Sequence, residues 1–128
     1  MRKTRVLIVD DDAVVRLAVL NSFADDPNTE VSASSSGQDV LNRLAGGEQI
    51  DRLLVDWNMP GLNGIELVRK VRADPRFSGM RILMVTSETL IECVALALAV
   101  GADDYLMKPF TKEMLLGKLA LLEVDCHE

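Results

Sequence analysis

The segment Leu53-Leu54-Val55-Asp56-Trp57-Asn58-Met59-Pro60-Gly61 decides the fold of this chain. Its first three residues form a short apolar run of the kind that makes a buried strand. Asp56 stands at the end of that strand, and Pro60-Gly61 turns the chain soon afterwards. Ligands bind at the carboxyl ends of the strands in open α/β sheets. Asp56 is therefore the first candidate functional residue.

Polar residues follow three other apolar runs in the same way. Asp10-Asp11-Asp12 follows the run 6–9, Thr86 follows 82–85 and Lys108 follows 105–107. If these strands are parallel neighbours, acidic groups, a hydroxyl and an ammonium group converge at one edge of the sheet. That combination suits a divalent cation and a phosphoryl group.

Strand-like and helical patterns alternate along the whole chain. We expect strands at about 5–9, 30–33, 53–55, 81–85 and 105–107. We expect helices at about 13–24, 64–73, 90–100 and 111–123, and one more between Ser34-Ser35-Ser36 and Gly46-Gly47. Asp12 is the expected N-cap of the first helix. Strict alternation predicts a single α/β domain with a doubly wound, five-stranded parallel sheet and helices on both faces.

The composition excludes several classes of protein. With 128 residues, 48% of them hydrophobic, the chain can bury one core, and its net charge of −6 argues against nucleic acid as a partner. Cys93 and Cys126 form no CxxC motif, which favours reduced thiols and a cytoplasmic location. His127, the single histidine, is at the end of the chain, so a Cys/His metal site is not expected. The runs 6–9 and 90–100 are too short for a secretory signal and a membrane span, respectively.

At this point the chain resembles the response-regulator receiver domains of two-component signalling. The resemblance rests on the motifs Val9-Asp10-Asp11, Asp56 with Met59-Pro60 and Asn63-Gly64, Thr86, and Lys108-Pro109-Phe110, in this order. It covers nearly the whole chain, so residues 1–128 are taken as one receiver domain. The stretches 56–60 and 84–86 are most similar to stand-alone chemotaxis regulators of the CheY type. The resemblance implies the flavodoxin-like strand order 2-1-3-4-5.

The resemblance also implies roles for the residues at the sheet edge. Asp56 would accept a phosphoryl group from a phosphohistidine on a sensor histidine kinase or a histidine phosphotransfer protein. Mg²⁺ or Mn²⁺ would be bound by Asp11, Asp56 and the backbone carbonyl of Asn58, with Asp10 holding a bound water. Lys108 and Thr86 would contact the phosphoryl oxygens, and the Lys108-Pro109 bond would be cis. The protein would then be a signalling switch that catalyses only its own phosphorylation and dephosphorylation.

The same resemblance suggests how the signal is passed on and ended. Phosphorylated Asp56 would draw Thr86 inward, and Tyr105 would rotate into the vacated space. This rotation would change the surface formed by the fourth helix, fifth strand and fifth helix. Asn58 and Glu88 flank the phosphoryl site and predict a short-lived phosphate.

The fourth helix is apolar nearly all round. Leu90, Ile91, Val94 and Leu98 share one broad face, to which Tyr105 and, on the fifth helix, Leu116 and Leu121 would add. We expect this surface to bind a downstream protein or a second copy of the chain. A more deeply packed helix is the alternative. Flagellar-switch-binding relatives carry lysines where Leu90 and Ile91 stand, which argues against motor binding.

Two other functions fit parts of the sequence. Residues 10–14 match the DxDx[TV] pattern of haloacid-dehalogenase-type phosphatases, in which Asp10 would be the nucleophile and Asp12 the general acid/base. Against this interpretation, the sequence shows neither a cap domain nor an acidic pair after Lys108. It would also leave Asp56 without a role. A flavin-binding, flavodoxin-like module would need a Ser/Thr-rich phosphate loop after the first strand, which is missing.

Overall fold

The computed structural model describes residues 3–124, so Cys126 and His127 lie outside the described residues. The strands are β1 (Thr4–Val9), β2 (Thr29–Ser34), β3 (Arg52–Val55), β4 (Arg81–Thr86) and β5 (Asp104–Met107). The α-helices are α1 (Ala13–Ser22), α2 (Gly37–Ala45), α3 (Gly64–Arg72), α4 (Ile91–Val100) and α5 (Lys112–Val124). A 3₁₀-helix, Pro75–Phe77, lies between α3 and β4.

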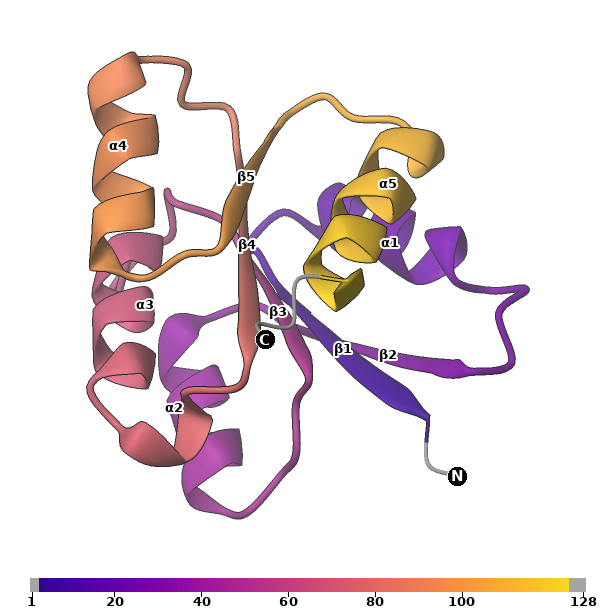
Figure 1. Cartoon of the computed structure of the whole chain (residues 1–128), viewed down its shortest axis with the longest axis horizontal. Coiled ribbons are helices and arrows are strands. Elements are labelled where there is room, and N and C mark those ends of the chain that lie inside the picture. Colours follow the sequence, from indigo (N-terminus) through magenta and orange to yellow (C-terminus); the bar gives the residue numbers. More distant parts are fainter. Residues whose placement is uncertain (1–2, 125–128) are drawn as a thin grey trace.

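All neighbouring strands are parallel, and their order is β2-β1-β3-β4-β5. Figure 1 shows α2, α3 and α4 on one face of the sheet, and α1 and α5 on the other. The predicted doubly wound sheet and its strand order are confirmed. No helix in the described range 3–124 combines the length and the apolar character needed to cross a bilayer.

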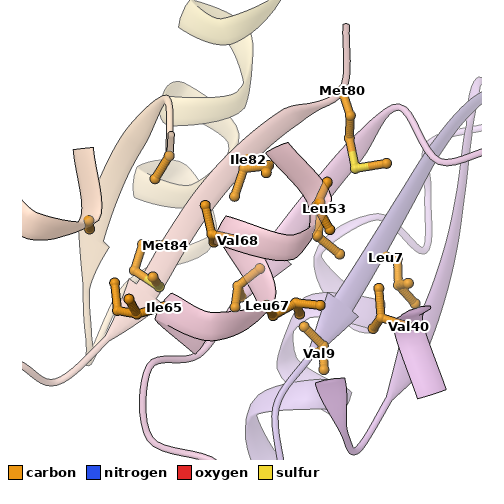
Figure 2. Packing of buried hydrophobic residues seen from close by; sticks show 14 of the residues in the cluster. Leu7, Val9, Val40, Leu53, Ile65, Leu67, Val68, Met80, Ile82 and Met84 are labelled. Atoms are coloured by element: carbon orange, nitrogen blue, oxygen red, sulfur yellow. The ribbon is translucent and has the colours of Figure 1, made fainter. Parts of the chain in front are cut away.

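The inner strands β1, β3 and β4 are mostly apolar because both faces of the sheet are covered, whereas the edge strand β2 is more polar and more exposed. Successive residues of β1 alternate between two cores: Leu7 and Val9 pack beneath α2, α3 and α4, whereas Val6 and Ile8 pack beneath α1 and α5. Figure 2 shows the first core, where side chains of α3 lie over those of the strands. These two cores fix the strands, and therefore fix the positions of the residues at the strand ends.

The helix starts are set by local hydrogen bonds. Asp12 caps α1 by accepting a hydrogen bond from the Val14 N–H at 2.9 Å, as predicted. Ser36 caps α2, and Asn63 forms a reciprocal capping box with Glu66 at the start of α3. No side chain caps α4, whose N-cap residue is Leu90.

Two local features differ from the sequence-based expectation. The first helix ends at Ser22 rather than at residue 24, because the chain already turns there and the N–H of Phe23 bonds to the Leu20 carbonyl at 3.3 Å. The 3₁₀-helix was not predicted. Asp74 caps it by accepting a hydrogen bond from the Arg76 N–H, and Pro75 occupies its first turn.

Candidate phosphoryl and metal site

The strand register brings the predicted polar residues to one edge of the sheet. The N–H of Asp56 bonds to the Val9 carbonyl at 3.0 Å, so β3 ends beside the last residue of β1. The N–H of Lys108 bonds to the Thr86 carbonyl at 3.0 Å, so β5 ends beside β4. The carboxyl ends of four strands therefore face the same space.

Three carboxylates form a compact cluster at this edge. Asp10, Asp11 and Asp56 each offer one oxygen, and these atoms all lie within 4.8 Å of one another. Asp10 and Asp56 are buried, whereas Asp11 is exposed. Mutually repelling carboxylates at this spacing favour a divalent cation, since Mg²⁺ prefers oxygen ligands and retains some of its waters. The donor set therefore fits the predicted metal.

Both carboxylate oxygens of Asp10 already accept hydrogen bonds from the protein. Its Oδ1 accepts a hydrogen bond from the Asp12 N–H at 2.9 Å, and its Oδ2 accepts one from the Lys108 ammonium at 2.8 Å. The Arg16 guanidinium donates to the Asp10 carbonyl at 2.7 Å. Asp10 thus has less freedom to bind a metal directly than Asp11 has. Sequence reasoning missed Arg16, because its spacing from Asp10 carries no motif.

Lys108 lies between the two buried carboxylates. Its Nζ is 2.8 Å from Asp10 Oδ2 and 3.4 Å from Asp56 Oδ1. Burial acts to lower the pKa of Lys108, but the hydrogen bond and charge of Asp10, followed by those of Asp56, outweigh it and raise the pKa. The side chain therefore carries a positive charge at neutral pH, directed at the Asp10 and Asp56 carboxylates.

The pKa of Asp56 is also raised, but for a carboxylate this disfavours the charged form. Burial raises the pKa of Asp56, the negative charge of Asp10 raises it further, and Lys108 only partly offsets both effects. A buried carboxylate short of positive charge gains from a second cation. The geometry therefore places a buried carboxylate oxygen, an ammonium group and a cluster of carboxylates that could hold a cation within one small site.

Thr86 and Tyr105 are both buried near this site. The Thr86 hydroxyl, at the end of β4, accepts a hydrogen bond from the Glu88 N–H at 3.3 Å. Tyr105 is only 8% exposed, and its hydroxyl donates to the Glu88 carbonyl. Tyr105 thus already lies inward in this structure, and the proposed rotation between an outward and an inward position stays a prediction.

The pair predicted to tune the phosphate lifetime lies together. The Asn58 amide donates to a carboxylate oxygen of Glu88 at 3.0 Å, although the residues are 30 positions apart in the sequence. Asn58 is exposed and Glu88 is half-buried. The loops after β3 and β4 are therefore joined by a hydrogen bond at the rim of the carboxylate cluster.

Gly64 is a residue whose role the sequence did not explain. Its N–H donates to the Trp57 carbonyl at 2.9 Å, which seats the start of α3 on the loop after Asp56. A Cβ at this position would overlap the Asp56 carbonyl oxygen and lie 2.9 Å from the Trp57 Cα. The Asn63-Gly64 motif was recognised, but only the tertiary structure shows that glycine is required for close approach.

Only some of the side chains expected on the partner surface of α4 are exposed. Leu90, Ile91 and Leu98 are 62%, 78% and 46% exposed, and Ala97 is the one buried residue of α4, so the deeply packed alternative is wrong. Val94, however, is half-buried and packs against the core beneath α4, and Tyr105 is buried. Val94 faces inward because it lies on the same side of the helix as Ala97, which contacts the sheet.

Of the two α5 residues expected to extend this apolar surface, only one is exposed. Leu121 is 60% exposed, as expected for a surface residue. Leu116 packs against the second core and lines a pocket with Phe23 at the end of α1, so it does not extend the α4 surface. The exposed apolar surface is therefore centred on Leu90, Ile91 and Leu98.

Comparison with known proteins agrees with this geometry. The family model for the response regulator receiver domain matches residues 6–120. A chemotaxis protein CheY homolog of Campylobacter jejuni is 37% identical over 115 residues, covering 90% of this chain and 88% of that protein. Chemotaxis protein CheY of Pseudomonas aeruginosa is 38% identical over 115 residues, with coverage of 90% and 92%.

A solved structure shares the whole architecture. The structure of Vibrio cholerae chemotaxis protein CheY4 superimposes with a TM-score of 0.86 at 35% identity, covering 94% of this chain and 98% of that one. The haloacid-dehalogenase alternative finds no support in these comparisons, and Asp12 serves as the cap of α1. The fold, the buried and paired charges at the sheet edge and the family match all agree. The chain therefore belongs to the response regulator receiver domain family, whose members are phospho-accepting signalling switches.

Proposed function

We propose that Asp56 is the phosphoacceptor of this receiver domain. The observation that carries the proposal is the pairing of the buried Asp56 carboxylate with Lys108 at 3.4 Å, beside Asp10 and Asp11. An Asp56 oxygen attacks the phosphorus of a phosphohistidine, and a P–O bond forms while the P–N bond breaks. The electron pair of that bond returns to the imidazole, which then takes up a proton.

The other residues at this edge of the sheet position the phosphoryl group and neutralise its negative charge. Asp11, Asp56 and the Asn58 carbonyl would hold Mg²⁺ or Mn²⁺, which would supply positive charge where the phosphoryl group meets the carboxylate. Lys108 supplies a second positive charge, and Asp10 holds Lys108 in place through its 2.8 Å contact. Thr86 offers its hydroxyl to the phosphoryl oxygens from the end of β4.

The phosphoryl donor is a sensor histidine kinase or a histidine phosphotransfer protein of the cytoplasm. An apolar groove of about 390 Å³ borders Lys108 and is lined by residues of α1 and of the β5–α5 loop, among them Val14, Ala18 and Phe110. Val14 is 74% exposed, so this side of the site offers apolar surface to an approaching protein. The protein is a switch and has no separate substrate to turn over.

The output of the switch passes through the surface of α4, β5 and α5. Glu88 connects the phosphoryl site to this surface, because its backbone contacts both Thr86 and the Tyr105 hydroxyl. A phosphoryl oxygen that accepts a hydrogen bond from the Thr86 hydroxyl draws this hydroxyl towards Asp56. The Glu88 N–H donates to the same hydroxyl oxygen, so the loop that carries Glu88 shifts with it. The exposed Leu90, Ile91 and Leu98 then bind a downstream protein or a second copy of the chain.

The test is chemical phosphorylation of the purified protein with phosphoramidate and Mg²⁺, followed by intact mass spectrometry. We expect the mass of one phosphoryl group to be gained and to be released by hydroxylamine, which cleaves acyl phosphates. The Asp56→Asn variant is expected to gain none. Trp57, the neighbour of Asp56, reports in parallel by its fluorescence whether beryllofluoride, a phosphoryl mimic, has bound.

The control for the phosphatase alternative is the Asp10→Asn variant. If Asp56→Asn still hydrolyses phosphate esters and Asp10→Asn abolishes that turnover, Asp10 is the nucleophile and the proposal is wrong. A label that persists in Asp56→Asn would also contradict it.

A further inference from the structure

Glu88 is held at both carboxylate oxygens by donors from different elements. Asn58, in the loop after β3, donates its amide to Oε2 at 3.0 Å. Cys93, in the first turn of α4, donates its thiol to Oε1 at 3.8 Å, a normal distance when the donor is sulfur. The carboxylate is thereby fixed between the phosphoryl site on one side and α4 on the other.

The backbone of Glu88 is held as firmly as its side chain. Its N–H bonds to the Thr86 hydroxyl, and its carbonyl accepts a hydrogen bond from Tyr105. Because the backbone is fixed, the carboxylate of Glu88 can move mainly by changing the rotamer of its side chain. The contacts from Asn58 and Cys93 restrict those rotamers.

The thiol of Cys93 is suited to a lasting donor role. Burial raises the pKa of Cys93, and the negative charges of Glu88 and Glu92 raise it further, so the thiol keeps its proton at neutral pH. It is the free cysteine among the described residues 3–124, and it is half-buried against the loop that carries Glu88. A protonated thiol donates one hydrogen bond, and here Glu88 receives it.

We propose that Cys93 is a positioning residue whose thiol, together with the Asn58 amide, holds the Glu88 carboxylate beside the phosphoryl site and so sets the lifetime of the Asp56 phosphate. The inference rests on the proposed function, since it concerns loss of the group that Asp56 accepts. A fixed carboxylate orients an attacking water on the phosphorus, whereas a mobile one does so for only part of the time. Cys93 acts through Glu88 and does not touch the phosphoryl group.

The experiment follows loss of the phosphoryl group from protein labelled with phosphoramidate, after removal of the donor. We expect Cys93→Ala to lose the group about threefold more slowly, the size of effect that one weak net hydrogen bond produces. Cys93→Ser keeps a donor at this position and is expected to return the rate towards that of the parent. In a Glu88→Ala background, Cys93→Ala is expected to have no further effect.

Two measurements separate this role from a structural one. Thermal unfolding and the Trp57 response to beryllofluoride are expected to stay unchanged in Cys93→Ala, because the thiol is only half-buried and its hydrogen bond is to Glu88 and not to Asp56, Lys108 or Thr86. Glu92→Gln, which removes a neighbouring exposed charge, is expected to leave the rate unchanged.

The inference would be overturned if Cys93→Ala lost phosphate at the parental rate. It would also be overturned if Cys93→Ala slowed the loss equally with and without Glu88, since the thiol would then act by another route. If neither parent nor variant acquires the label, the failure is that of the proposed function and not of the role of Cys93.

Discussion

At the scale of single residues, the pKa values of Asp56 and Lys108 are both raised, which disfavours the charged form of the carboxylate and favours that of the ammonium group. Burial, followed by the charge of Asp10, raises the pKa of Asp56, whereas contacts with Asp10 and Asp56 raise that of Lys108 against the effect of burial. The folded protein thus binds a proton at Asp56 more tightly than the unfolded chain does. Linkage then requires that the contribution of Asp56 to the unfolding free energy falls as pH rises from about 3.8 through the raised pKa.

The Asp56→Asn variant tests this consequence. Because it removes a buried charge that is incompletely neutralised, we expect its unfolding free energy near pH 7 to exceed that of the parent by about 1 kcal/mol in the absence of divalent metal. We expect the difference to shrink as the pH falls through the raised pKa of Asp56 towards about 3.8, because the carboxyl group of the parent is then protonated in the folded protein. Urea unfolding at a series of pH values measures it.

The matched control for this comparison is Asp25→Asn, which removes the same charge at an exposed position far from the cluster. Its stability is expected to stay within about 0.5 kcal/mol of the parent. An Asp56→Asn variant that is no more stable than Asp25→Asn at neutral pH would show that Lys108 already neutralises the site.

At the scale of elements, the packing of α3 against the loop after β3 determines where Asp56 points. The Gly64 N–H bond to Trp57 and the lack of a Cβ let the first turn of α3 approach the Asp56 backbone. We expect Gly64→Ala to lower the unfolding free energy by about 1–3 kcal/mol through overpacking. Because the loop must shift, beryllofluoride binding followed by Trp57 fluorescence is also expected to weaken.

Gly117→Ala provides the opposite control. Gly117 lies within α5, and a Cβ there meets no atom within 4 Å. Alanine is the better helix former, so this variant is expected to gain up to about 1 kcal/mol of stability and to bind the mimic normally. If Gly64→Ala bound the mimic as well as Gly117→Ala does, close packing at Gly64 would not be what positions Asp56.

At the scale of the whole molecule, the carboxylate cluster exists only when the sheet is assembled. Asp10 and Asp11 follow β1, and Asp56 follows β3, so the unfolded chain does not hold these groups together. A cation that binds the folded state alone stabilises the entire domain, by about 2.7 kcal/mol at a hundredfold excess over the dissociation constant. We therefore expect Mg²⁺ to raise the melting temperature by several degrees and chelation to reverse the rise.

The specificity of that effect is testable by differential scanning calorimetry at constant ionic strength. Asp11→Ala is expected to lose the response to Mg²⁺, because Asp11 is the exposed and least engaged member of the cluster. Asp25→Asn is expected to keep it. An equal response in Asp11→Ala would mean that the metal binds elsewhere on this acidic protein.

Much of the fold could be predicted because the local and global preferences agree. Apolar runs bounded by turn residues marked the strands, and alternation with helical patterns implied a parallel sheet covered on both faces. The C-terminal end of α1 and the 3₁₀-helix at Pro75–Phe77 are harder to predict, because they depend on single hydrogen bonds made by Phe23 and Asp74. Such bonds leave little trace in hydrophobic periodicity.

The sequence by itself determined which chemical groups this protein could bring to one edge: acidic residues, a threonine and a lysine, each directly after an apolar run. Only the tertiary structure decided which of these groups bond to one another. Contacts such as Lys108 with Asp10, or Asn58 and Cys93 with Glu88, join distant parts of the chain. It also decided that Val94 and Tyr105 face inward while Leu90 and Ile91 stay exposed. Periodicity shows that a helix is apolar, but the neighbouring elements decide which of its faces they cover.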